Sequence, residues 1–490
     1  MPIDDVFPAL LTSSRLTAVS TDKGPQIRTI YDVKFYPYNT IDDDQVFALV
    51  AEECVAVCRT KLGSEPHFEV LSWIVDEEES IASYNSLVWT KHPTTRKPLL
   101  CIAGHKPKHI KILDVETGRP VRNLVGHGKG INDLAVSPLS TSLLFSAAED
   151  NTIRLWNLEP EYEKQPCVAL FGGEGHKSPV LAMHLHPNGK WMLTGGIDTA
   201  VCLWAVPDLE ELRREDGSPP DQEPMVVYHP HFFSKEVHSN YVDSFAFYDD
   251  LIISRAARDP KYQDRNEILI WRIEGFDPEA TRPSQPPIPE GLRRTRTSFT
   301  SDEGLAFKRL LTLDMPHTDR FYQRFGFLHA PVMRPILAMG DQKSKFCFWD
   351  LQRLDEGLDP KYAAKLKKSR GRKTKTVSAT NNLQRLGDIR RSESVAEVTP
   401  STTPDASSTV TAEREYALAD PYLLIKPHHT EESKTELSKV EGTLRHFATS
   451  QIAWSPDGTW MIAVGDLGMI TIFHRDKAVV NLQDETLSGT

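Results

Sequence analysis

The sequence has no apolar run close to the ~20 residues that a membrane-spanning helix needs. It also has no CxxC pair, because its cysteines are scattered as Cys54, Cys58, Cys101, Cys167, Cys202 and Cys347. Scattered cysteines indicate reduced thiols of the nucleus or cytosol rather than a zinc site or a disulfide framework. The first residues carry acids where a secretory signal peptide needs bases, so we expect neither secretion nor membrane insertion.

An excess of positive charge is lacking as well. The chain has 57 Lys and Arg against 68 Asp and Glu, a net charge of −11. This balance argues against a protein that wraps nucleic acid through its overall field, and it favours basic partners, of which histone tails are one class. With 39% hydrophobic residues, the chain has enough apolar material for a sizeable core.

A repeat is what the sequence does contain. Two adjacent stretches, 126–156 and 175–204, superpose with a histidine-to-histidine period of 49 residues. Each has a histidine, a hydroxyl residue 18 or 19 positions later, an aspartate four positions further and a tryptophan six positions after that. The two sets are His127, Ser146, Asp150, Trp156 and His176, Thr194, Asp198, Trp204.

This spacing is typical of a WD repeat, a propeller blade of four antiparallel strands. In such a blade the four side chains form a buried hydrogen-bonded chain, here called the tetrad. A buried carboxylate is tolerated only when it is paired, and the histidine supplies the donor. Because the set recurs, we interpret these residues as scaffold and not as a catalytic His/Ser/Asp group.

Weaker copies end at Trp271, at Trp349 and at Phe473, which takes the tryptophan's place, and two further units precede the tetrads. The fold class predicted is therefore all-β, a seven-bladed WD40 β-propeller over residues 24–476. Closing the ring removes sheet edges that would otherwise aggregate. We expect residues 1–23 to supply a strand, around Ser14–Ser20, that completes the last blade, and residues 477–490 to form a tail.

Two long loop insertions interrupt the rhythm. Residues 276–304 are rich in Pro, Arg and Ser, and residues 356–415 begin with a basic run and continue into a Ser/Thr/Pro tract. Both compositions predict disorder. The basic run, 365–375, has three interpretations: a nuclear import signal, a weak contact with nucleosomal DNA, or a solvated loop.

Other motifs do not carry chemistry. The glycines of 126–130 lack P-loop spacing. The pairs His184/His186 and His229/His231 have no third ligand suggested. We therefore predict no enzyme activity, no cofactor and no metal.

Longer strings are more specific than the tetrads. GHGKGINDLAVSP, LFSAAEDNTIRLWNLE, the Phe171–His176 string FGGEGH and the string from His238 to Ser254 resemble the EED/Extra sex combs family, the WD-repeat subunit of Polycomb repressive complex 2. The resemblance covers most of 25–275, 305–351 and 450–475, and the long insertions resemble a fungal member.

The resemblance implies a noncatalytic nuclear scaffold and reader that acts in gene silencing. Its implied partners are an Enhancer-of-zeste type SET-domain methyltransferase, which it stimulates and a helix of which lies on the face away from the reader site, a Suppressor-of-zeste type subunit, and the trimethylated histone H3 tail. The alternative is a WD-repeat adaptor for another ligand, such as a ubiquitin-ligase substrate.

The family's aromatic cage for trimethyl-lysine maps onto Tyr31, Tyr84, Phe321 and Tyr322. The spacing from Tyr84 to Trp89 is one residue longer than the family's pattern. A trimethylammonium group cannot donate a hydrogen bond, so it is recognised by the negative faces of aromatic rings. The competing interpretation is that these aromatics only pack within the blades.

Overall fold

The computed structural model describes residues 7–16, 29–39, 44–63, 65–76, 82–208, 211, 223–258, 266–289, 291, 293–301, 303–330, 333–355, 420–433 and 446–475. The chain divides into two compact units, residues 1–351 together with 420–490, and residues 352–419. In the second unit only the last residues of helix α1 (Leu351–Asp355) are described. The predicted insertion 356–415, its basic run 365–375 and the tail 477–490 therefore lie outside the described residues.

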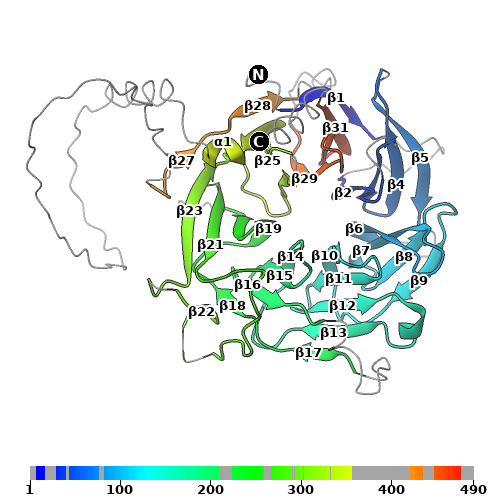
Figure 1. Ribbon diagram of the computed structural model, residues 1–490. Coiled ribbons are helices and arrows are strands. Elements are labelled where there is room, and N and C mark those ends of the chain that lie inside the picture. Colours follow the sequence, from blue (N-terminus) through cyan, green and yellow to red (C-terminus); the bar gives the residue numbers. More distant parts are fainter. Residues whose placement is uncertain are drawn as a thin grey trace, which may run out of the picture. The chain divides into compact units, whose positions relative to one another are not determined.

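The first unit is made of seven sheets, each built on four antiparallel strands, which are arranged as blades around a central opening (Figure 1). This arrangement confirms the predicted seven-bladed propeller. Numbered along the chain and given from the innermost strand outward, the first blade is β2 (Asp32–Phe35), β3 (Val46–Ala51), β4 (Cys54–Thr60) and β5 (Phe68–Val75), and the second is β6 (Ser83–Lys91), β7 (Pro98–Lys106), β8 (Ile110–Asp114) and β9 (Pro120–Leu124). The third blade is β10 (Ile131–Val136), β11 (Leu143–Ala148), β12 (Ile153–Asn157), β13 (Cys167–Phe171) and β17 (Met225–Val227); the fourth is β14 (Val180–Leu185), β15 (Trp191–Gly196), β16 (Val201–Ala205), β18 (Phe232–Ser234) and β22 (Thr295–Thr297); the fifth is β19 (Val242–Tyr248), β20 (Leu251–Ala256), β21 (Glu267–Ile273), β23 (Phe307–Asp314) and β27 (Leu424–Ile425). The sixth blade is β24 (Gly326–Leu328), β25 (Ile336–Gly340), β26 (Lys345–Asp350) and β28 (His429–Glu432), and the seventh is β29 (Thr449–Trp454), β30 (Trp460–Gly465), β31 (Met469–His474) and β1 (Ala9–Arg15).

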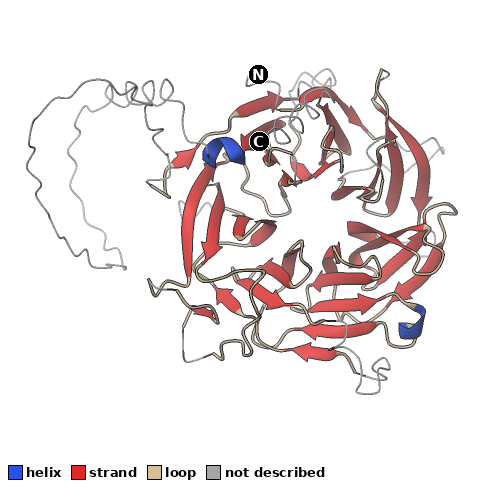
Figure 2. Cartoon of the chain, viewed as in Figure 1, coloured by secondary structure: helices blue, strands red, loops and turns tan. Residues whose placement is uncertain are grey.

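Strands make up nearly all of the regular structure (Figure 2), and the described helices are the 3₁₀ turn η2 (Pro160–Tyr162) and α1. None of the described helices is long and apolar enough to cross a membrane. Apolar clusters fill the spaces between neighbouring blades, so each blade is stable only against its neighbours.

The last blade takes its outermost strand from the start of the chain. β1 pairs antiparallel with β31, and Ser13 Oγ donates to Thr471 Oγ1 at 3.0 Å. This strand ends at Arg15, so it overlaps the segment expected around Ser14–Ser20 only at its last two residues. Its position is fixed upstream, where the Phe7 ring stacks on His429 with centroids 5.4 Å apart.

Three consecutive blades have a fifth strand, and each comes from the following blade. The connections that precede the outermost strands β18, β23 and β28 first run along the edge of the preceding blade, as β17 on β13, β22 on β18 and β27 on β23. Each connection therefore ties two blades together and covers an edge that would otherwise be exposed.

The predicted disorder of 276–304 is wrong, because most of this insertion is folded against the fourth blade. Phe276 and Phe299 pack on Trp191, with ring centroids 5.3 and 5.8 Å away, and Trp191 Nε1 donates to the Pro278 carbonyl at 3.2 Å. Two buried aromatic rings at the ends of a polar segment are enough to anchor it, and composition averaged over the segment does not detect them.

Both predicted tetrads form. His127 Nδ1 lies 2.9 Å from Asp150 and its Nε2 lies 2.7 Å from Ser146 Oγ, which also accepts the Trp156 Nε1 proton at 2.8 Å. The second set has the same contacts at 3.0, 2.9 and 2.9 Å. Although burial disfavours its charge, the bond to His127 holds the pKa of Asp150 below its usual range.

A third, incomplete tetrad lies in the fifth blade. His238 Nε2 is 2.7 Å from Ser254 Oγ, which accepts from Trp271 Nε1 at 2.8 Å. Arg258 stands where the aspartate would be, four residues after Ser254. Among the described residues His238 has no carboxylate partner, and burial and the charges of Arg309 and Arg255 lower its pKa to about 3.

We predict that Ser146→Ala destabilises the fold by about 1–3 kcal/mol, because it leaves the His127 and Trp156 ring nitrogens without a partner in the core. Urea unfolding followed by tryptophan fluorescence measures the loss. Ser301→Ala is the control, since its hydroxyl bond is exposed and its removal should change stability by less than about 0.5 kcal/mol. Equal effects of the two variants would contradict the tetrad's role.

A pH dependence follows from His238. Its folded-state pKa of about 3 lies below its ordinary value near 6.5. Between these two pH values the imidazole is protonated in the unfolded chain and neutral in the folded protein. The free energy of unfolding should be highest above about pH 6.5 and fall as the pH is lowered toward 4. His238 should account for roughly 1–3 kcal/mol of this fall. His238→Gln should be less stable at pH 7 but show a shallower decline in unfolding free energy between pH 7 and 4.5. An unchanged slope would refute the assignment.

Candidate functional site

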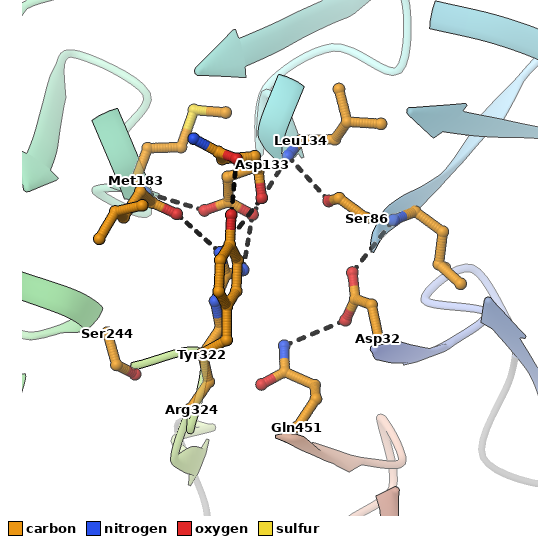
Figure 3. A network of polar contacts seen from close by, with 12 residues as sticks. Asp32, Ser86, Asp133, Leu134, Met183, Ser244, Tyr322, Arg324 and Gln451 are labelled. Carbon is orange, nitrogen blue, oxygen red and sulfur yellow. Dashed lines mark hydrogen bonds and ion pairs between the residues drawn. The ribbon is translucent and has the colours of Figure 1, made fainter. Parts of the chain in front are cut away.

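Polar contacts join the innermost strands at five of the seven junctions between blades, near one mouth of the propeller, and are here called the polar ring (Figure 3). In each contact a side chain of one blade binds the next blade. The contacts are Leu87 N–H to Asp32 at 3.0 Å, Leu134 N–H to Ser86 at 3.1 Å, Met183 N–H to Asp133 at 2.8 Å, Phe325 N–H to Ser244 at 3.3 Å and Gln451 Nε2 to Asp32 at 3.1 Å. The mouth is thus built on fixed backbone.

Arg324 joins opposite sides of this ring. Its Nη1 donates to Asp133 at 2.8 Å and its Nη2 to the Leu181 carbonyl at 2.8 Å. Although burial opposes the charged form, the carboxylates of Asp133 and Asp32 raise the pKa of the Arg324 guanidinium. A permanent cation therefore lies beneath the mouth.

Tyr322 lies directly beside Arg324 (Figure 3), and its hydroxyl donates to Asn132 Oδ1 at 2.6 Å. Burial raises the pKa of the Tyr322 phenol, so the phenol stays neutral. Arg324 opposes this shift, and the carboxylates of Asp133 and two other acids add to it. The Phe321 ring is 5.2 Å from the Tyr322 ring between centroids, and 49% of Phe321 is exposed. An accessible aromatic ring is thus fixed beside a partly exposed one.

Tyr31 leads into β2 at the same end of the ring, because the innermost strands of all blades start there. Tyr31 is half-buried, and this burial raises the pKa of its phenol. The negative charges of Glu52 and Asp466 raise that pKa further. Asp466 accepts from Arg320 at 2.9 Å and from Thr29 Oγ1 at 3.5 Å. The chain before Tyr31 and the loop that carries Phe321 and Tyr322 therefore meet at one carboxylate.

The structure does not bring Tyr84 to this surface. Its side chain is 1% exposed in the core between the first two blades, and its hydroxyl bonds Asp76, which also pairs with Lys111 at 2.8 Å. The pairing of β6 with β7 shifts register on both sides of Tyr84. This irregularity accounts for the extra residue between Tyr84 and Trp89.

Sequence reasoning missed Arg324, Asn132 and Asp466. Arg324 follows the aromatic pair by two residues, but its partners lie on other blades, and only the closed ring shows them. In the described part of the chain, no group of three or more His, Cys, Asp or Glu side chains is placed to hold a metal ion.

The opposite end of the propeller has two hollows. A cavity of about 490 Å³ continues the central channel below Arg324, lined by His184, Phe247 and Trp454 among others. A groove of about 590 Å³ runs beside the first three blades and includes Trp89 and Leu139, which is 71% exposed.

Comparison with known proteins agrees with this architecture. The family description "WD domain, G-beta repeat" matches residues 118–157 and 166–205, the two stretches with complete tetrads. The Polycomb protein EED of Chaetomium thermophilum is 34% identical over 536 residues, covering 91% of this chain and 90% of its own length. The Polycomb protein esc of Drosophila melanogaster is 27% identical over 337 residues, 66% of this chain and 71% of its own.

Solved structures give the same relation. A chain in the crystal structure of the Chaetomium thermophilum Polycomb repressive complex 2 is 32% identical, with a TM-score of 0.74 and coverage of 96% of this chain and 98% of that chain. A chain in a structure of ctPRC2 in complex with H3K27me3 and H3K27M has the same values. Identity and coverage together confirm the resemblance seen in the sequence: this chain belongs to the Polycomb EED/Extra sex combs family of WD-repeat proteins.

Proposed function

We propose that this protein is the noncatalytic scaffold and reader subunit of a Polycomb repressive complex 2, acting in gene silencing in the nucleus. Its relative from Chaetomium thermophilum is part of such a complex, and one solved form of that complex contains H3K27me3, the histone H3 tail trimethylated at lysine 27. The coverage of 91% of this chain supports a shared role for the whole propeller.

The reader site proposed is formed by Tyr31, Phe321 and Tyr322. The observation that carries it is the half-exposed Phe321 ring, held next to Tyr322. A trimethylammonium group gains roughly 0.5–2 kcal/mol from each desolvated aromatic face. The nearby carboxylates of Glu52 and Asp466 add a field that attracts a basic histone tail.

Tyr84 has a different place in this proposal from the one expected. A ring that is 1% exposed and bonded to Asp76 offers no face to a ligand in this conformation. We assign Tyr84 to the packing between the first two blades, and the cage to the other three rings.

The partners proposed are an Enhancer-of-zeste type methyltransferase, which the reader stimulates, and a Suppressor-of-zeste type subunit. The groove that contains Trp89 and Leu139 lies at the end of the ring away from the aromatic site, and it supports docking of a methyltransferase helix there. A weak nucleosomal DNA contact through 365–375 belongs to the same proposal and rests on sequence alone.

Phe321→Ala should weaken binding of an H3 peptide trimethylated at lysine 27 by roughly tenfold, because one aromatic face is lost, and Tyr322→Ala by at least as much. Isothermal titration calorimetry with the trimethylated and unmodified peptides measures this. Tyr228→Ala is the matched control, since Tyr228 lies on the rim and is 50% exposed. Tyr84→Phe should bind like the wild type. Unchanged affinity in a folded Phe321→Ala or Tyr322→Ala protein would eliminate the cage.

Affinity capture of the tagged full-length chain from fungal nuclear extract tests the complex. We expect a SET-domain methyltransferase to be recovered in comparable amount, and Leu139→Asp to reduce that recovery because it replaces an exposed apolar side chain of the groove by a charge. The same variant should keep trimethyl-lysine binding, which separates the two faces. Recovery of cullins in place of the methyltransferase would support the ubiquitin-ligase adaptor and contradict the proposal.

A further inference from the structure

An arginine occupies a place in the fifth blade where the third and fourth blades have almost no side chain. The residue after the tetrad hydroxyl is Ala147 in the third blade, Gly195 in the fourth and Arg255 in the fifth. All three have the same register, opposite Asp133, Ala182 and Ser244 of their inner strands.

In the fourth blade a small residue is required at this place, because the next blade packs directly on it. A Cβ added to Gly195 would lie 2.5 Å from Cε2 of Phe245 in the inner strand of the following blade. The Arg255 side chain therefore extends toward the loop that precedes the inner strand of the sixth blade, which contains Phe321 and Tyr322.

The contacts of Arg255 confirm this direction. Its side chain is 1% exposed and forms an ion pair with Asp243, which is equally buried. Nη1 donates to the Gln323 carbonyl at 2.9 Å, and Nη2 donates to the Arg320 carbonyl at 2.6 Å and to the Thr318 carbonyl. One guanidinium thus binds three carbonyls within six residues of a single loop.

Two of these carbonyls flank the aromatic pair. The Arg320 carbonyl comes immediately before Phe321, and the Gln323 carbonyl comes immediately after Tyr322. Tyr322 has φ +61°, a left-handed conformation that is unfavourable for a bulky residue and persists only when its surroundings enforce it. With the carbonyls turned toward one cation, Phe321 stays exposed on the loop while the Tyr322 hydroxyl reaches Asn132.

We propose that Arg255 is a positioning residue that holds the backbone on both sides of Phe321 and Tyr322 and so fixes how the two rings meet trimethyl-lysine. The inference rests on the proposed reader function. Arg255 is beneath the loop and touches no ligand itself, so its effect on binding passes through the loop's conformation.

The chemistry of the site favours arginine over lysine. A guanidinium has two separate Nη atoms that reach Asp243 and three carbonyls at fixed angles, whereas an ammonium concentrates its donors on one nitrogen. Arg255→Lys keeps a cation beside Asp243, so that carboxylate is not left unpaired in the core. The substitution removes the bridging geometry and retains the ion pair.

The test uses the full chain with Arg255→Lys and Arg255→Ala and measures two properties. Amide hydrogen exchange should speed up by on the order of tenfold in residues 316–325, with the third-blade tetrad strands unchanged. Affinity for the H3 peptide trimethylated at lysine 27 should fall roughly tenfold, and the preference over the unmodified peptide should shrink with it. Arg255→Lys decides the question if Arg255→Ala does not fold.

Arg475→Lys is the matched control, because Arg475 is also 1% exposed and donates to the Gly458 carbonyl at 3.5 Å in a different blade. It should lose stability without changing exchange in 316–325 or peptide preference. Wild-type exchange of 316–325 in folded Arg255→Lys overturns the inference, as does raised exchange with unchanged peptide preference. A wild-type protein that ignores trimethylation would instead refute the reader function, while the exchange result would still decide whether Arg255 holds the loop.

Discussion

Closure of the ring through its innermost strands is the constraint on which everything else depends. Side chains such as Asp32 and Asp133 accept backbone N–H groups of the next blade, and Gln451 of the last blade returns to Asp32. Because each of these bonds links two neighbouring blades, a shift of either blade would disturb the other. The aromatic pair on one mouth and the groove at the other end inherit their geometry from this ring.

The scaffold could be predicted from sequence because its chemistry demands residue types at fixed spacing. A buried aspartate needs a histidine as its partner, and the histidine needs a hydroxyl, as Asp150, His127 and Ser146 show. A recurrence of this pattern at the same spacing therefore predicts another blade. The aromatic pair was found through longer family strings. Tyr84 could not be placed, because a register irregularity in β6 decides which way its ring points.

The misjudged insertion 276–304 and the overlooked Arg255 have a common cause. In both, a few long-range contacts outweigh local composition: Phe276 and Phe299 meet Trp191 from far along the chain, and Arg255 meets carbonyls some 65 residues later. Sequence patterns record what a segment prefers by itself, and neither preference nor periodicity states what lies across a blade boundary. Only tertiary structure supplies that information.

Pairing of β1 with β31 also has a consequence for how the protein is made. The partners Ser13 and Thr471 are 458 positions apart, and at ribosomal rates of about 5–20 residues per second roughly half a minute or more passes between their synthesis. During that interval the first strand is committed to no partner, and the nascent ring is an open arc with two bare ends. Folding of this propeller thus ends with a single long-range zipping step, and chaperones have their longest opportunity to act just before it.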